Sequence, residues 1–185
     1  MSVLSDVGIR TAVQFGKIKI YPLMENAIQP ASVDVHLGNT LRVPKAELLE
    51  YYDPTSPPSK NMYDLVELKP GEAFALEFGK FVLGATVEHV TMGRYHTSHI
   101  DGISSLGRLG LIIHSGSCWI DPGFSGTVTL EMSVSSQIPV ILVPGMRIGQ
   151  LVIETVDPPV QTLYGSDKLG SKYQGQTLPG QSKGN

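Results

Sequence analysis

The chain has 185 residues, of which 41% are hydrophobic and 17% are charged, and its net charge at pH 7 is −3. This length suits one domain, and the composition predicts a folded globular protein rather than a disordered chain. The acidic balance argues against a general nucleic-acid-binding protein, and no apolar run approaches the roughly 20 residues that cross a membrane. We therefore expect a cytoplasmic protein with neither nucleic acid nor membrane as a partner.

The first predicted element is a short amphipathic helix within the segment LSDVGIRTAVQFG. Ser5 is a suitable N-cap and Asp6 follows in the first turn, where a negative charge is favourable. Ile9 and Val13 lie four residues apart on one helix face, and Gly16 ends the element.

From Lys17 onward, short apolar or alternating runs are separated by Pro, Gly and Asn, a pattern that favours β-structure. The clearest strand is TVTLEMSVS, in which Val128, Leu130, Met132 and Val134 share one face and Glu131 lies on the polar face. IPVILV and RIGQLVIE are predicted as further strands, joined by a turn at PGM. Many short strands of this kind predict a closed or double-sheet β architecture such as a jelly roll.

Two segments are expected to lack regular structure. The proline-rich stretch Glu50 to Asp64 is predicted to be a loop. The tail beyond Pro158 has almost no aliphatic residues, so it cannot order itself by core packing. It is expected to be disordered, or folded onto a ligand or a neighbouring subunit.

No motif for a common nucleotide-binding or metal-dependent site is found. Walker and Rossmann glycine patterns are absent, and a single cysteine, Cys118, excludes an intrachain disulfide and a cysteine-rich zinc site. Cys118 is expected to be a small buried residue. The pair His96 and His99 has no third ligand and is predicted to lie in a loop or at the surface.

Several polar residues allow two interpretations. SSLGRLG, with Arg108, suits an anion but is also typical of a plain polar turn. Glu131 on a strand face is either a solvated carboxylate or a functional one. Asp34 and Asp121 stand beside turn residues, where aspartate often caps the backbone.

Five stretches, QPASVDVHLG, DGISSLGRLGL, WIDPGFSGTVTLE, PGMRIGQL and GSKYQGQ, resemble in order and spacing the deoxycytidine triphosphate (dCTP) deaminase family of the dUTPase-like superfamily. The resemblance covers essentially the whole chain. It implies a mainly β, distorted jelly-roll β-barrel with a short N-terminal helix, as one domain over 1–185 whose flexible tail, 159–185, closes over the nucleotide. It also implies a homotrimer with active sites at subunit interfaces, and Mg²⁺ held mainly by the triphosphate of a pyrimidine deoxynucleotide, with no direct protein ligand.

The resemblance assigns residues as follows. Glu131 matches the catalytic glutamate, and Asp121 aligns with an aspartate that activates water for pyrophosphate release. Ser32 to Gly38 match a motif near the phosphates and metal. Arg108 and Ser104, which lie around the phosphates and the reacting base, are matched as further catalytic residues. The residues matched to substrate binding surround the nucleotide or close the tail over it: Ser105, Gly107, Ser117, Trp119, Gln150, Tyr164, Lys172 and Gln176.

Hydrolytic loss of ammonia from C4 of cytosine needs a base that takes a proton from water and returns it to the ring nitrogen and then to the leaving amine. Glu131 is the predicted shuttle, and the base itself needs no metal. The motifs WIDPGFSG and RIGQL look more like the bifunctional branch of the family, which goes on to the monophosphate and pyrophosphate.

Four positions depart from the family pattern. Ile103 stands where arginine or lysine usually precedes the serine pair, and loss of such a charged contact would cost about 1.5–3 kcal/mol of triphosphate binding. Gly116 and Ser117 replace a Thr-Ala pair linked to feedback by thymidine triphosphate, and Cys118 replaces glycine or histidine. These changes predict altered specificity more than lost catalysis.

Three hypotheses follow. The first is dCTP deamination, with pyrophosphate release. The second is a triphosphatase acting on dUTP or a modified pyrimidine nucleotide without deamination. The third is a nucleotide-binding regulatory trimer without turnover. Ammonia release separates the first from the second, and nucleotide binding without product would support the third.

Overall fold

The structure is a computed structural model that describes residues 2–45, 51–55 and 62–184. These residues are mainly β, with one short N-terminal helix and a second helix of a single turn, in agreement with the predicted fold class. The helices are α1 (Asp6–Gln14) and α2 (Ser104–Gly107). The strands are β1 (Ile18–Tyr21), β2 (Val33–His36), β3 (Thr40–Pro44), β4 (Tyr63–Glu67), β5 (Phe74–Leu76), β6 (Phe81–Met92), β7 (His96–Gly102), β8 (Leu111–Ile112), β9 (Trp119–Ile120), β10 (Ser125–Val134), β11 (Val140–Leu142) and β12 (Arg147–Thr155).

The N-terminal helix forms as the sequence predicts. The Ser5 hydroxyl accepts a hydrogen bond from the Gly8 amide, and Gly16, with a φ of 66°, ends the turn after the helix. Ile9 and Ala12 are buried, so α1 packs its apolar face on the sheets.

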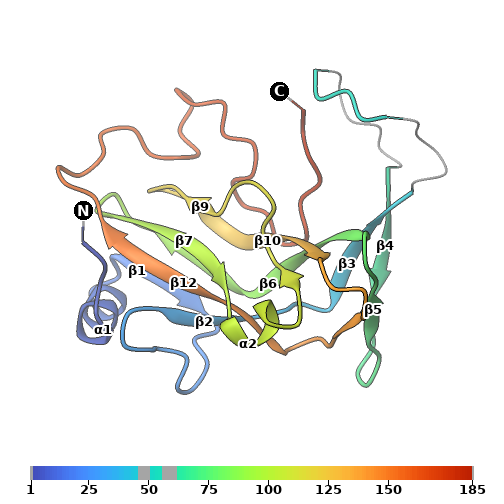
Figure 1. Cartoon of the computed structure of the whole chain (residues 1–185). Coiled ribbons are helices and arrows are strands. Elements are labelled where there is room, and N and C mark those ends of the chain that lie inside the picture. The colour runs from blue at the N-terminus through green and yellow to red at the C-terminus, as the bar shows by residue number, and fades with distance from the viewer. Residues whose placement is uncertain (1, 46–50, 56–61, 185) are drawn as a thin grey trace.

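A two-stranded sheet, β11-β5, and two larger antiparallel sheets enclose the core (Figure 1). One has the order β4-β3-β6-β10-β8, with β1 also paired to β6, and the other has the order β2-β12-β7-β9. The core cluster takes side chains from both sheets, including Leu130 and Met132 of β10 and Leu151 and Ile153 of β12. The alternation predicted for β10 is therefore confirmed, and it leaves Glu131 on the face away from the core.

The local predictions for the later strands and the loops are confirmed in part. IPVILV and RIGQLVIE do form strands, β11 and β12, with a turn at PGM between them, and β11 pairs with β5 whereas β12 pairs with β2 and β7. Part of the predicted loop over 50–64, namely 50 and 56–61, lies outside the described residues. Residues 51–55 have no helix or strand, as predicted, whereas the last two residues of the predicted loop, Tyr63 and Asp64, begin β4. Cys118 is only half-buried, although it packs against the core.

The predicted tail, 159–185, has no regular secondary structure over the described residues and passes above β9 and β10 (Figure 1). It packs on its own chain: the Tyr164 ring meets Phe124 at a centroid distance of 5.9 Å, and the Thr127 amide donates to the Gln176 carbonyl. Backbone and ring contacts, rather than aliphatic burial, hold this segment. Neither helix of the described residues is long and apolar enough to span a membrane.

His96 is not in a loop or at the surface as predicted. It lies in β7, is 5% exposed, and its Nδ1 has no hydrogen-bond partner among the described residues. Burial, reinforced by repulsion from Lys17, lowers the pKa of His96. The fold therefore favours the neutral imidazole.

This burial predicts a loss of stability in mild acid. As the pH falls below the ordinary histidine pKa of about 6.5, His96 takes up a proton in the unfolded chain but stays neutral in the folded chain. The free energy of unfolding therefore decreases until the pH reaches the lower pKa that His96 has in the folded chain. Between pH 7.5 and 5.5 the melting temperature of the parent protein should fall further than that of His96→Gln. Equal falls in the two proteins would contradict this assignment.

Candidate active site

The Glu131 carboxylate is held by the backbone of the loop that precedes β9. Its Oε2 accepts hydrogen bonds from the Ser115 amide at 3.0 Å and the Gly116 amide at 3.1 Å. The Glu131 amide in turn donates to the Ile113 carbonyl. Because two amides fix one carboxylate oxygen, Oε1 remains the oxygen that can accept a proton from a ligand or a water.

Residues of the same loop and of β9 complete one wall of this site. Ser117 and Trp119 are exposed, and the Trp119 ring stacks on His99 with an interplanar angle of 8°. Asp101 lies 3.5 Å from both His99 and His114, and His114 immediately precedes Ser115. These contacts brace the loop that orients Glu131. They were not predicted from the sequence, in which His99 was considered only as a possible metal ligand beside His96.

The tail forms the opposite wall. The Gln176 side chain donates to the Thr127 carbonyl at 2.7 Å and to the Thr129 hydroxyl at 3.1 Å, two residues from Glu131 along β10. The Tyr164 amide donates to the Pro122 carbonyl beside Asp121, and its hydroxyl accepts from the Tyr173 amide. Lys172 donates to the Gly184 carbonyl within the tail. The tail thus contacts two places near the site: β10 through Gln176, and the turn that contains Asp121 through Tyr164.

Tyr63 and Arg42 also belong to this neighbourhood. Burial raises the pKa of the Tyr63 phenol, the charges of Tyr52 and Glu131 raise it further, and Arg42 opposes them. Tyr63 therefore stays a neutral phenol near Glu131. No local sequence signal marks either residue, because the strand order β4-β3-β6-β10 brings them here.

The predicted anion-binding residues lie elsewhere in the chain. Ser104, Ser105 and Gly107 form the one-turn helix α2, and Arg108 ends it. The Arg108 side chain is exposed and makes no hydrogen bond or ion pair within the described parts of the chain. Among the described residues, no hydrogen bond or ion pair joins Arg108 or the serine pair to Glu131, so within one chain the two groups are not in direct contact.

Ile103, at the position of the missing cation, is the N-cap residue of α2 and makes no side-chain hydrogen bond there. Gln150 lies in β12, where its Oε1 accepts from the Ser32 hydroxyl at 3.1 Å. It is paired in register with Asp101 of β7, just before α2. Gln150 and the serine pair therefore lie toward the same end of the β2-β12-β7-β9 sheet.

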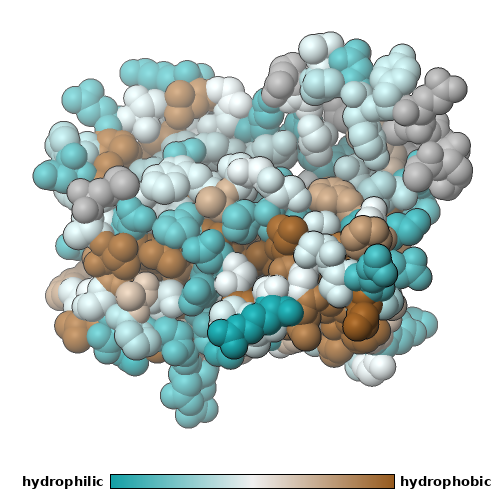
Figure 2. All heavy atoms as spheres, in the orientation of Figure 1, coloured by the Kyte–Doolittle hydropathy of each residue, from teal (hydrophilic) through white to brown (hydrophobic). Residues whose placement is uncertain are grey.

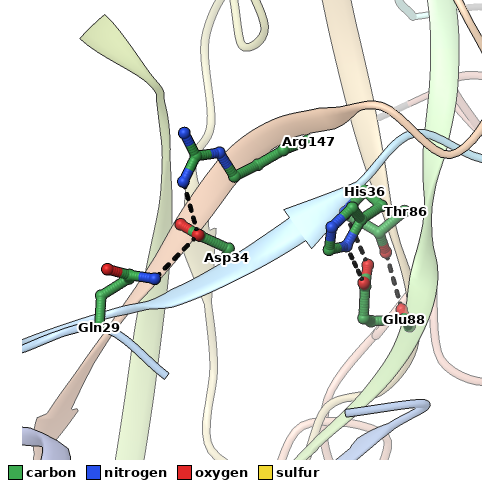
Figure 3. A network of polar contacts seen from close by, with 6 residues as sticks. All are labelled: Gln29, Asp34, His36, Thr86, Glu88 and Arg147. Atoms are coloured by element: carbon green, nitrogen blue, oxygen red, sulfur yellow. Dashed lines mark hydrogen bonds and ion pairs between the residues drawn. The ribbon is translucent and has the colours of Figure 1, made fainter. Parts of the chain in front are cut away.

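Figure 3 shows Asp34 and His36, the two residues of the motif Ser32 to Gly38 that point polar side chains from β2. Asp34 is buried and bonds Arg147 at 2.9 Å and Gln29 at 3.1 Å, while Glu88 binds the His36 ring at 2.7 Å. Asp34 is thus a buried ion-pair partner rather than a turn cap. Asp121 also does not cap with its side chain: it is exposed, and only its backbone carbonyl bonds in the turn, to the Phe124 amide.

The described side chains do not form a group that could bind a metal ion without a ligand from the substrate. Over these residues, no three His, Cys, Asp or Glu side chains lie close enough together to hold an ion. Asp34 is already paired with Arg147, which leaves it a poor ligand. The donor set therefore fits a metal that brings its ligands with it on a polyphosphate better than a resident ion.

Comparison with known proteins agrees with the resemblance seen in the sequence. A family model described as dCTP deaminase-like matches residues 3–156. Proteins named dCTP deaminase, dUMP-forming, are similar over nearly the whole chain: that of Corynebacterium jeikeium is 45% identical over 98% of this chain and 96% of its own, and that of Mycolicibacterium gilvum is 46% identical over 98% and 95%.

A solved structure shares the fold. The 2'-deoxycytidine 5'-triphosphate deaminase of Agrobacterium tumefaciens superposes with a TM-score of 0.65 at 23% identity. The match covers 83% of this chain, and this chain spans about half of that protein, 48% of its length.

The close approach of Gly123 to the tail generates a prediction. Gly123 has a φ of 99°, and a Cβ there would lie 2.7 Å from Leu163 Cβ and 2.8 Å from the Tyr164 amide. We expect Gly123→Ala to displace the tail and to speed hydrogen exchange of the Tyr164 amide.

The matched control is Gly71→Ala. Gly71 has a similar φ of 86°, but a Cβ there would meet nothing within 4 Å. Both variants carry the backbone penalty of roughly 1–2 kcal/mol for a left-handed alanine. Equal exchange of the Tyr164 amide in the two variants would show that the close contact does not hold the tail.

Proposed function

Since the chain belongs to the dCTP deaminase-like family, we propose that it hydrolyses dCTP to dUTP and ammonia and then hydrolyses dUTP to dUMP and pyrophosphate. The observation that carries this proposal is the Glu131 carboxylate, fixed by two backbone amides on a face that the tail borders. The name shared by the relatives includes both deamination and dUMP formation, which favours this function over a triphosphatase without deamination or a binding protein without turnover.

Glu131 would act as the proton shuttle of the first reaction. Its free oxygen takes a proton from water as the water oxygen bonds to C4, and returns that proton to N3 of the ring. A second proton then passes from the new hydroxyl group to the amine, the C4–N bond breaks, and ammonia leaves. The Ser115 and Gly116 amides keep the carboxylate in one orientation through these steps, which limits the cost of reorganisation.

The phosphate side of the site would be built from α2 and β12. Arg108 offers a guanidinium with no hydrogen-bond or ion-pair partner among the described residues, and Ser104, Ser105 and Gln150 offer neutral donors. Mg²⁺ bound to the triphosphate would neutralise its charge. For the second reaction, the exposed Asp121 carboxylate is the candidate to accept a proton from the water that attacks phosphorus.

These groups would meet between subunits of a homotrimer. Apolar side chains reach the surface around α2, β5 and β11 (Figure 2), among them Leu109, Ile112, Ile138 and Ile141, which are 42–75% exposed. Apolar surface of this kind is typical of a protein–protein interface. A neighbouring chain that covers it could bring Arg108 and the serine pair to Glu131.

Two variants test the site and the assembly together. Glu131→Gln keeps the shape of the side chain but removes the shuttle, so ammonia release from dCTP should fall by at least about 100-fold. Arg108→Ala should also be inactive, because the phosphate cation is lost. Neither variant should change the oligomer mass.

Mixed oligomers provide the control. When the two inactive variants are unfolded, mixed in equal amounts and refolded together, a quarter of the interface sites, about 25%, combine an intact Glu131 with an intact Arg108 from different chains. Ammonia release should return toward that fraction of the parent rate. A mixture that stays inactive would place both residues of each site in one chain, and full activity of Glu131→Gln alone would remove Glu131 from the mechanism.

A further inference from the structure

We infer that Arg42 is a positioning residue for the proposed reaction, acting by fixing residues 176–180 of the tail beside Glu131. Arg42 lies in β3 and pairs in register with Leu83 of β6, which pairs with Glu131 of β10. Paired residues of neighbouring strands point to the same side of a sheet. Arg42 and Glu131 therefore share one face, with backbones two strand spacings or roughly 10 Å apart.

The Arg42 side chain binds the tail directly. Its Nε donates to the Pro179 carbonyl at 2.6 Å, and Pro179 is itself buried. Among the described residues, Arg42 is the one charged side chain that bonds to 176–180. A hydrogen bond from a guanidinium is stronger than a neutral one, so this contact is the strongest single anchor of the segment.

Neutral contacts on β10 continue from this anchor toward Glu131. The Gly180 amide donates to the Thr129 hydroxyl at 3.0 Å, and the Gln176 side chain donates to the same hydroxyl. Thr129 lies two residues from Glu131 on the same face of the strand. The Pro179 contact thus sets where the tail meets the strand that carries Glu131.

The tail depends on these polar anchors because it has little packing beneath it. Thr177, Leu178 and Pro179 border a cavity of about 460 Å³ whose other walls include Thr40, Ala85 and Thr127. Leu178, the one aliphatic residue of the segment, is 47% exposed. Pro179 is thus the one buried apolar side chain of the segment, and the Arg42 bond to its carbonyl adds to that packing. Because the segment forms no strand of the sheets, loss of the Arg42 contact should free the segment rather than unfold the sheet.

This inference rests on the proposed function for its kinetic part, and its test has a part that does not. We would compare Arg42→Ala, Arg42→Lys, a chain ending at Gln176, and that shortened chain with Arg42→Ala. Arg10→Ala is the matched control, since Arg10 is an exposed arginine of α1. Ammonia release from dCTP gives kcat and KM, and hydrogen exchange of the Gly180 amide in the full-length proteins reports the tail contact directly.

We expect Arg42→Ala to lower kcat/KM about tenfold and to speed Gly180 exchange, with melting temperature unchanged relative to Arg10→Ala. Arg42→Lys, which keeps a charged donor, should recover much of both. In the shortened chain Arg42→Ala should have no further effect, because the residue it acts through is gone.

Unchanged Gly180 exchange in Arg42→Ala, or a further loss of kcat/KM when Arg42→Ala is added to the shortened chain, would overturn the inference. If the parent protein released no ammonia from dCTP, the proposed function would fail while the exchange measurement would still decide whether Arg42 holds the tail.

Discussion

Two backbone hydrogen bonds, from the Ser115 and Gly116 amides to Glu131 Oε2, are the interaction on which the site depends. They join a glycine- and serine-rich loop to the polar face of β10. They also hold the Glu131 side chain in one orientation, whereas a free carboxylate would sample several rotamers. The contacts of Asp101 with His99 and His114 brace the loop from the other sheet. The position of Glu131 is thus set by both sheets at once.

The tail is the second constraint. Its sequence offers almost no aliphatic surface, and ordering such a segment costs backbone entropy at every residue. It is held instead by the ring contact of Tyr164, by Gln176 on Thr127 and Thr129, and by Arg42. Few and polar anchors would suit the proposed role of the tail as a cover that opens for a charged nucleotide and closes again, since no large apolar area would be exposed in each cycle.

Local patterns predicted the helix α1 and the two faces of β10, because capping and alternation depend on residues near in sequence. Contacts between strands that are far apart in the sequence have no local pattern from which they could be predicted. Tyr63 was assigned to a loop, yet the β3–β4 ladder brings it near Glu131, and His96 was placed at the surface although β7 buries it. Asp34 stood beside turn residues, but its partner Arg147 is more than a hundred residues away.

The most direct measurement is the product balance of the parent protein incubated with dCTP and Mg²⁺, with nucleotides separated by ion exchange and ammonia and pyrophosphate quantified in the same samples. The account predicts that ammonia, pyrophosphate and dUMP appear in equal amounts. Ammonia with dUTP as the final product would contradict the second hydrolysis. Unchanged dCTP, when the same protein cleaves dUTP in a parallel incubation, would contradict deamination at Glu131.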